Sequence, residues 1–332
     1  MENRKYLYDN LLDSLVKKVP KKSELVNIVT DTLRIEKESA YRRLRGEIPF
    51  TLNEAGAIAS RMGISMDELI YRNGQKKPSL TYMALPLDSS MEDYDYESLK
   101  LLIKSFKEIS FHANSEHGMA VNTLPATLYL NLKNLTRFLF FKWSHRYEDP
   151  GAYLRYNEII LSDQGLRLQN ELGTYMHKID KTICIIDEAL IGSIIKDLRY
   201  YMTIRYISSD EADALLSDLV TLIDDIERIA QYGRFPDTGN KFELYLSGVN
   251  IGTSYNYASG GHDYVSSFTT FVIQPAVSYQ KETYLKVKDW VYYLRRMSTL
   301  ISVVGVKERM EFLDRQRRLI DELHEEYSRP TT

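Results

Sequence analysis

Apolar and polar positions alternate with a helical period at the start of the chain. Within 1–73, apolar residues recur every three or four positions, and this spacing predicts five short amphipathic helices. Two tetrapeptides, TLNE and SMDE, have the Thr/Ser-x-x-Glu form of a capping box, which satisfies free backbone N–H groups at a helix start. They predict helices over about 51–62 and 65–72, and Gly63 ends the first of them.

A pair of helices precedes these two. Ser23 is placed to cap the first helix of the pair. The chain then breaks at Arg34-Ile35, and the second helix spans about 36–46, where Gly46 ends it. The apolar face of the first helix contains Leu25, Ile28, Val29 and Leu33.

The helix over 36–46 has two distinct sides on a helical wheel of about 100° per residue. Its apolar side carries Ala40, Tyr41 and Leu44, which predicts that these residues anchor the helix. Its opposite side is polar and rich in arginine, and consists of Glu38, Ser39, Arg42, Arg43 and Arg45. An arginine cluster on a short helix is more often a solvated face than a binding site, so the wheel alone does not assign a function.

The arrangement of these helices resembles the helix-turn-helix of the phage-repressor (Cro/CI-like) superfamily, over about residues 7–73. The resemblance implies that 36–46 is the recognition helix of a DNA-binding domain. Its outer residues would then face the major groove, and Arg45 at its end would meet a phosphate. The DNA-binding residues implied in this way are Lys37, Glu38, Ser39, Arg42, Arg43 and Arg45.

The chain departs from the family's pattern at two positions. Arg34 stands in the turn where the family has glycine, and Glu36 stands where a Ser or Thr caps the recognition helix. An arginine in a left-handed turn costs roughly 1 kcal/mol or more relative to glycine. The resemblance therefore leaves the shape of the turn as an expectation to be checked.

The remaining chain predicts a mainly α fold with a small sheet. A segment rich in breaks and acidic residues separates a helix-turn-helix domain at 1–75 from the rest, as a linker at 76–95. We expect 96–332 to be an α+β domain, mostly helical up to 235. The period then changes at 241–275, which predicts a small antiparallel meander of three or four strands. Two helices close the chain, the second after Gly305, and Ser209 is placed to cap an earlier helix that ends at Gly233.

Composition narrows the class of protein. The single cysteine, Cys184, excludes an internal disulfide framework and favours a cytoplasmic location. No apolar run is long enough for a membrane span, so no membrane partner is expected. Residues 1–77 carry 15 Lys and Arg against 11 Asp and Glu, an excess of four positive charges. That excess is too small for bulk electrostatic binding to nucleic acid, so a few well-placed residues would have to do it.

Catalytic constellations are missing from the sequence. The histidines have no zinc-binding spacing, and no phosphate loop or nucleophile motif is present, so we expect no metal, no cofactor and no enzymatic activity. Two features of the C-terminal domain have open alternatives. The aromatic residues of the meander either pack the sheet or line an effector pocket: Tyr245, Tyr255, Tyr257, Tyr264, Phe268 and Phe271. The apolar stripe of the last helix packs internally or forms a dimer interface: Val306, Met310, Leu313, Ile320 and Leu323.

Together these patterns predict a sequence-specific DNA-binding transcription regulator that reads double-stranded DNA as a homodimer, with 96–332 serving dimerisation and an unidentified small-molecule or protein effector. The C-terminal residues also loosely resemble those of uncharacterised bacterial regulators with the same N-terminal module. Two alternatives stay open. The N-terminal fold could bind another protein, or the chain could be a ligand sensor without direct DNA contact.

Overall fold

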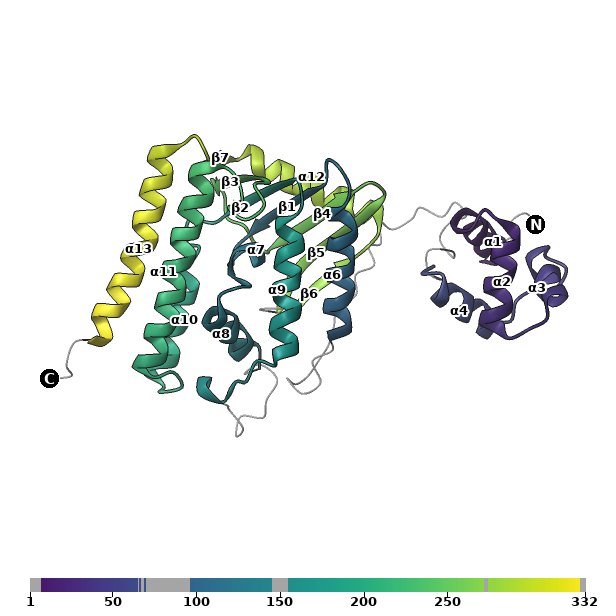
Figure 1. The fold of residues 1–332 in the computed structure, drawn as a ribbon, viewed down its shortest axis with the longest axis horizontal. Coiled ribbons are helices and arrows are strands. Elements are labelled where there is room, and N and C mark those ends of the chain that lie inside the picture. The colour runs from purple at the N-terminus through teal and green to yellow at the C-terminus, as the bar shows by residue number, and fades with distance from the viewer. Residues whose placement is uncertain are drawn as a thin grey trace. The chain divides into compact units, whose positions relative to one another are not determined.

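The computed structural model of the chain describes residues 7–64, 66, 69, 96–144, 155–271 and 274–328. The chain divides into two compact units, Met1–Leu80 and Thr81–Thr332 (Figure 1). The predicted linker at 76–95 lies outside the described residues.

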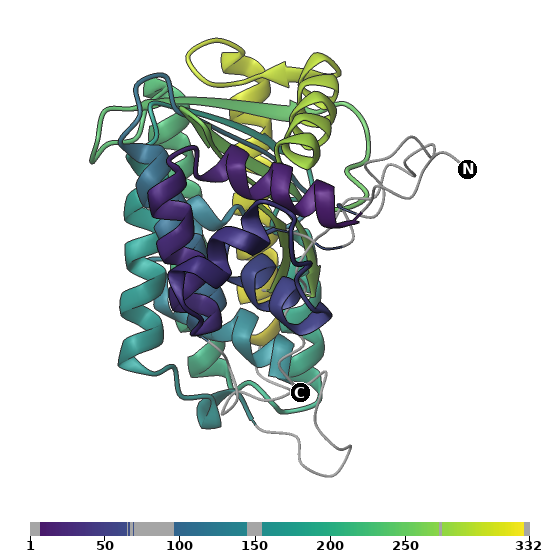
Figure 2. The same cartoon turned by 90° about the vertical axis from the view of Figure 1, so that its right-hand side faces the viewer.

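The N-terminal unit is built from short helices around one apolar core. Its helices are α1 (Leu7–Lys18), α2 (Lys22–Leu33), α3 (Lys37–Leu44) and α4 (Leu52–Arg61), and Figure 2 shows them crossing one another. Of the fifth predicted helix, 65–72, only Met66 and Leu69 are described. Leu69 is fully buried, and its carbonyl accepts a hydrogen bond from Asn10 Nδ2. The buried apolar residues of the unit are Leu11, Leu15, Leu25, Val26, Val29, Ala40, Phe50, Ala55, Ile58 and Leu69.

Local start and stop signals explain most boundaries of these helices. The first capping box is confirmed: Thr51 accepts a hydrogen bond from the Glu54 N–H, and Glu54 accepts one from the Thr51 N–H. Gly46 (φ 79°) and Gly63 (φ 57°) adopt the left-handed conformation that ends a helix. The second capping box falls largely outside the described residues. The prediction that Ser23 caps α2 was wrong. The helix begins at Lys22, its N-cap residue is Lys21, and Ser23 lies inside its first turn.

The C-terminal unit contains a seven-stranded mixed sheet with the strand order β6-β5-β4-β1-β2-β3-β7. The predicted small antiparallel sheet is therefore wrong in size and in type, although β4, β5 and β6 do form an antiparallel meander. The strands are β1 (Glu116–Val121), β2 (Lys181–Ile186), β3 (Lys241–Ser247), β4 (Tyr255–Gly260), β5 (Asp263–Phe271), β6 (Gln274–Ser278) and β7 (Ser298–Leu300).

Strands β1 and β2 lie in the part of the chain that the sequence predicted to be mostly helical. They pair in parallel with each other, and β2 also pairs in parallel with β3. Helical segments connect these strands, as parallel pairing requires. The helices of the unit are α6 (Tyr96–Ser110), α7 (Ala126–Tyr129), α8 (Lys133–Ser144), α9 (Asp163–His177), α10 (Gly192–Thr203), α11 (Ser209–Tyr232), α12 (Lys281–Arg296) and α13 (Val306–Ser328), with a 3-10 turn at Tyr156–Glu158.

Three predicted helix boundaries in this unit can be compared with the structure. Ser208, not Ser209, caps α11, and it does so in a capping box with Glu211. Gly233 ends the same helix in the left-handed conformation, as predicted. Gly305 precedes α13 with a φ of 66°.

Successive side chains of each strand point to opposite faces of the sheet, and both faces are covered by helices. Ala120, Ile183 and Ile185 pack against α12 on one face. Met119 and Cys184 point to the other face, where helices including α8, α11 and α13 complete the largest core cluster. Figure 1 also shows α6 and α9 crossing this second face, over β4 and β5. The central strands are therefore apolar on both sides, unlike a half-exposed sheet.

The aromatic residues of the meander mainly pack the sheet. Tyr245 and Tyr257 are buried in the cluster under α12, and Tyr255, Tyr264 and Phe268 pack against it. The side chain of Phe271 lies outside the described part of the chain.

The apolar stripe of α13 divides into two parts. Its central residues, Leu313, Ile320 and Leu323, are buried in the largest core cluster. Val306 and Met310, at the start of the helix, are exposed. The internal alternative therefore holds for the central residues, and only the first two remain available for an interface.

No helix in the described part of the chain combines the length and apolar character needed to cross a membrane.

Candidate nucleic-acid interface

The turn between α2 and α3 has a left-handed residue at its centre. Arg34 adopts φ 53° and ψ 46°, and its N–H donates to the Thr30 carbonyl at the end of α2. The conformation is the one that a glycine would adopt without strain. The arginine therefore forms the tight turn expected of a helix-turn-helix despite the departure from the family's pattern, at a local energetic cost.

The start of α3 has no side-chain cap. Glu36 occupies the N-cap position in an extended conformation, and its side chain makes no capping hydrogen bond. The Glu36 side chain therefore accepts no hydrogen bond from the backbone N–H groups in the first turn of α3. Their positive partial charge stays available to an acceptor outside the helix.

The inner side of α3 is anchored as the helical wheel predicted. Ala40 is fully buried, and Tyr41 and Leu44 are half-buried against the core of the unit. Tyr8 in α1 fixes the end of the helix, because the single proton of its hydroxyl is shared between the carbonyl of Arg43 and that of Ile48, the latter at 3.2 Å. Contacts with α1 and with the apolar core of the unit thus hold α3 in position.

Arg43 is turned inward, which corrects its predicted outward position. Its side chain is only 16% exposed, and its Nη2 lies 2.8 Å from Glu54 Oε1. Glu54 also caps α4, so one carboxylate joins the two helices. Burial disfavours the charged form of Glu54, but the hydrogen bonds from Thr51 and Arg43 outweigh it, and the pKa of Glu54 is lowered. Arg43 is therefore a structural residue of the module in this conformation.

Other predicted residues of α3 do face solvent. Lys37, Glu38, Arg42 and Arg45 are exposed, whereas Ser39 is half-buried. The side chains of Arg42 and Arg45 are 51% and 46% exposed. The outer face of α3, which we define as Lys37, Glu38, Ser39 and Arg42, is therefore narrower than predicted, with Arg45 at its end.

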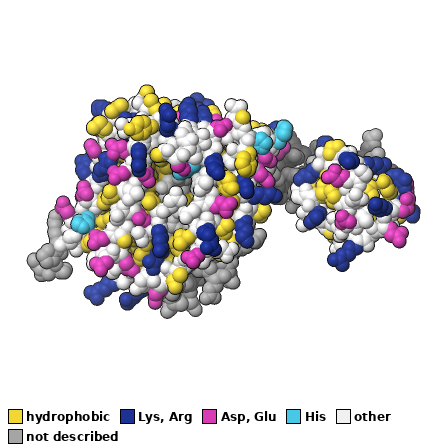
Figure 3. Space-filling model, viewed as in Figure 1, with side chains coloured by type: hydrophobic (Ala, Val, Ile, Leu, Met, Phe, Trp, Pro, Cys, Tyr) yellow, Lys and Arg dark blue, Asp and Glu magenta, His cyan; other side chains and the backbone are white. Residues whose placement is uncertain are grey.

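Acidic side chains accompany the exposed arginines. Glu47 lies 3.5 Å from Arg42 Nε through Oε2 and 2.8 Å from Arg45 Nε through Oε1. Glu38 Oε1 lies 3.4 Å from Arg45 Nη2. Pairs this exposed contribute about 0–1 kcal/mol each, so the arginines can exchange them for phosphate or base contacts at little cost. Figure 3 shows basic and acidic side chains together on the α3 side of the module.

Two residues that the sequence did not single out belong to the same surface. Lys22, at the start of α2, places its Nζ 5.9 Å from the centre of the Tyr41 ring. Glu47 forms ion pairs with both exposed arginines, Arg42 and Arg45. No sequence motif marks either residue. Each belongs to this surface only because it contacts a side chain at α3: Lys22 contacts Tyr41, and Glu47 contacts Arg42 and Arg45.

Metal-binding clusters are not found among the described residues: no group of three or more His, Cys, Asp or Glu is arranged to hold an ion. The buried Cys184 has a raised pKa because burial disfavours its thiolate.

Comparison with known proteins bears on the N-terminal part of the chain. The family model of the BetR domain, a helix-turn-helix-type DNA-binding domain, matches residues 6–93. No curated protein and no solved structure matches the chain.

Proposed function

We propose that the protein is a sequence-specific DNA-binding transcription regulator that inserts α3 into the major groove and acts as a homodimer, without enzymatic activity. The observation that carries this proposal is the exposed outer face of α3 within a unit that matches a DNA-binding helix-turn-helix domain. Both the turn at Arg34 and the anchoring of Ala40 support a rigid presentation of that face.

The proposed roles follow from exposure. Arg42 reads a base edge, because an exposed guanidinium can pair bidentately with guanine O6 and N7. Lys37 and Ser39 lie toward the start of α3, where uncapped N–H groups also favour a phosphate. Arg45 binds a phosphate at the helix end, and Glu38 restricts the bases that α3 accepts. Arg43 supports the interface by positioning α3 on α4.

A dimer is part of the proposal because one such module reads only a few base pairs. Two modules on half-sites about 34 Å apart would give a specific operator. We place the contact between copies at the start of α13 and the loop before it, where Val303, Val304, Val306 and Met310 are all more than half exposed. Val303 also has a φ of 64°, a strained conformation for a β-branched residue. The short edge strand β7 immediately precedes this loop, so a second copy could extend the contact along the sheet edge.

Selection of bound sequences from random DNA tests the DNA-binding proposal. The wild-type chain should enrich a two-fold symmetric motif, and Arg42→Ala should relax the preference at one base in each half-site. Arg167→Ala, at an exposed position of α9, is the matched control and should leave the motif unchanged. Absence of DNA binding even at low salt would contradict the proposal and favour a protein-interaction module instead.

Sedimentation of the free protein tests the contact between copies. Met310→Lys should shift the chain toward a monomer, because a charge would be buried in the contact. Ile160→Lys, which places the same charge on another exposed apolar position, should leave the dimer intact. A dimer unaffected by Met310→Lys would place the interface elsewhere.

A further inference from the structure

The C-terminal unit contains a cavity between the sheet and its covering helices. The cavity has a volume of about 180 Å³, and α6, α7, α8 and α9 enclose it against β1, β4, β5 and β6. Tyr257, one of the aromatic residues that pack under α12, is also among the residues that line it, whereas Tyr245, Tyr255, Tyr264 and Phe268 are not. The cavity therefore shares one residue, Tyr257, with the pocket that the aromatic residues of the meander suggested in the sequence.

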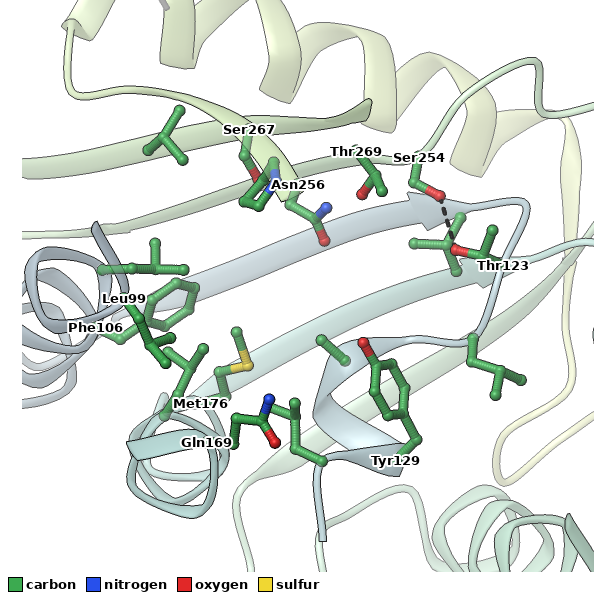
Figure 4. A pocket seen from close by; sticks show the side chains of 18 of the residues that line it. Leu99, Phe106, Thr123, Tyr129, Gln169, Met176, Ser254, Asn256, Ser267 and Thr269 are labelled. Carbon is green, nitrogen blue, oxygen red and sulfur yellow. Dashed lines mark hydrogen bonds between the residues drawn. The ribbon is translucent and has the colours of Figure 1, made fainter. Parts of the chain in front are cut away.

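The lining of the cavity is mostly apolar and carries no formal charge. Figure 4 shows Leu99 and Phe106 from α6 and Met176 from α9 on one side, with Asn256 and Ser267 from the strands opposite them. None of the residues that line it in the described part of the chain is Asp, Glu, Lys or Arg. Because an ion in such a cavity would lack a counter-charge, the lining selects against charged molecules.

Three buried polar side chains that line the cavity carry atoms without a hydrogen-bond partner among the described residues. They are His117, with both ring nitrogens, Thr136 Oγ1 and Gln169 Oε1. Their exposed fractions are 1%, 2% and 8%. Buried polar groups in proteins are almost always hydrogen-bonded, and each exception calls for an explanation. Three exceptions on one cavity indicate a site whose polar groups are paired by something that enters it.

His117 fits this interpretation in its geometry and its charge. It lies on β1, and the Phe106 ring meets it edge-on, with ring centres 5.2 Å apart. Burial, followed by the nearby His177, lowers the pKa of His117 to about 3, so its imidazole is neutral near pH 7. A neutral imidazole offers one donor and one acceptor, which suits an uncharged partner.

We propose that this cavity binds an uncharged, mainly apolar small molecule of about the size of a substituted aromatic ring, held by hydrogen bonds to one or more of His117, Thr136 and Gln169. The size follows from the volume, because a dry protein cavity of about 150 Å³ holds benzene. Binding of this molecule is independent of DNA. Only its role as the effector of a regulator rests on the proposed function.

Three matched probes test the chemistry by calorimetric titration of the full chain without DNA. Toluene has the ring alone, p-cresol adds one hydroxyl, and 4-methylbenzoate adds a negative charge. We expect p-cresol to bind about tenfold more tightly than toluene, a ratio that one hydrogen bond supplies, and 4-methylbenzoate not to bind. Equal binding of the benzoate, or no binding of either neutral probe up to its solubility, would overturn the proposal and leave a cavity that holds solvent only.

Isosteric variants test the polar groups. Gln169→Leu and Thr136→Val each remove an unpaired oxygen and keep a similar side-chain shape, so both variants should still fold. At least one should abolish the preference for p-cresol over toluene while toluene affinity stays the same. If neither variant changes that ratio, the polar groups take no part and the proposal fails.

A buried glutamine with partners provides the control. Gln316 Oε1 accepts from the Ile191 N–H at 3.3 Å, and its Nε2 donates to the Glu188 carbonyl at 2.9 Å. Gln316→Leu should therefore lower the melting temperature without changing the p-cresol preference. Since these titrations contain no DNA, a failure of the DNA-binding proposal would leave their outcome intact. A second titration of DNA with and without p-cresol tests the regulatory role separately.

Discussion

Arg43 Nη2 lies 2.8 Å from Glu54 Oε1, and this contact joins α3 to α4. Both side chains are at least four-fifths buried, at 16% and 20% exposure. Glu54 uses its other oxygen, Oε2, to accept the Thr51 N–H at 2.8 Å. The capping box of α4 and the orientation of α3 are therefore set by the same carboxylate.

Arg43→Ala should destabilise the N-terminal unit more than Arg42→Ala. Loss of Arg43 leaves Glu54 with an unpaired, largely buried oxygen and should lower the free energy of unfolding by about 1–3 kcal/mol. Arg42 is half exposed, so its loss should cost about 0.5 kcal/mol or less. Both tryptophans, Trp143 and Trp290, lie in the other unit, so hydrogen exchange of peptides within 7–64 is the suitable measurement. Equal protection in the two variants would contradict the structural role of Arg43.

The same ion pair predicts a response to acid. The pKa of Glu54 is lowered from 4.5 in the folded chain, so its stabilising contribution is fully present above pH 4.5 and is lost as the pH falls through the lowered value. Exchange protection of α3 and α4 should therefore decrease below pH 4.5. Glu54→Gln should be less stable at pH 7 and should depend less on acid. Glu24→Gln, at an exposed position of α2, is the control and should keep the wild-type response.

Glu47→Gln should strengthen DNA binding. The carboxylate of Glu47 pairs with Arg42 and Arg45 in the free protein and would repel phosphates in the complex. Removing it frees two guanidinium groups, and we expect affinity to rise about threefold to tenfold at low salt, because each exposed pair is worth about 0–1 kcal/mol. Fluorescence anisotropy with a selected operator measures this. Asp13→Asn removes one negative charge from α1 and should have a smaller effect.

Arg34→Gly should stabilise the turn between α2 and α3. Glycine adopts the left-handed conformation of this residue without strain, and we expect the free energy of unfolding of the N-terminal unit to rise by about 1 kcal/mol. Arg34→Lys keeps both the strain and the charge and should leave stability unchanged. Hydrogen exchange of α2 and α3 peptides distinguishes the two variants. A loss of protection in Arg34→Gly would mean that the arginine side chain itself supports the turn.

The parts of the N-terminal unit that could be predicted are those set by local signals. The capping box at Thr51 and the glycines at 46 and 63 each act within about four residues, so the sequence alone identifies them. The inward turn of Arg43 depends on Glu54, eleven residues away across a loop, and a helical wheel cannot show it. A sequence hint existed, since a capping glutamate uses one carboxylate oxygen and leaves the other free for a cation.

The C-terminal sheet was less predictable because its central strands have no alternating pattern. The strand at 181–186, KTICII, is apolar on both faces, and such a run cannot be distinguished from a buried helix by period. The cavity depends even more on distant contacts, because His117, Thr136 and Gln169 come from three separate elements. Only β4 to β6, whose turns and β-branched or aromatic residues are local signals, were identified correctly as a meander.

Gly118 in β1 faces Tyr257 in the neighbouring strand β4, and this pair should tolerate no added side chain. A Cβ at Gly118 would lie 2.1 Å from Tyr257 Cε1. The ring has little freedom to move away, because it is 1% exposed and its hydroxyl donates to Glu116 Oε1 at 2.8 Å. Gly118→Ala should therefore lower the free energy of unfolding of the C-terminal unit by about 3 kcal/mol or more.

Urea unfolding followed by the fluorescence of Trp143 and Trp290 measures this loss, since both lie in the same unit as Gly118. Gly252→Ala is the matched control, because its added Cβ would meet nothing within 4 Å. It should change stability by about 0.5 kcal/mol or less. The steric cause can be isolated in a Tyr257→Ala background, where Gly118→Ala should cost about 1 kcal/mol or less, giving a large coupling energy between the two sites. A full cost of Gly118→Ala in that background would show that the backbone of β1, and not the tyrosine ring, requires glycine.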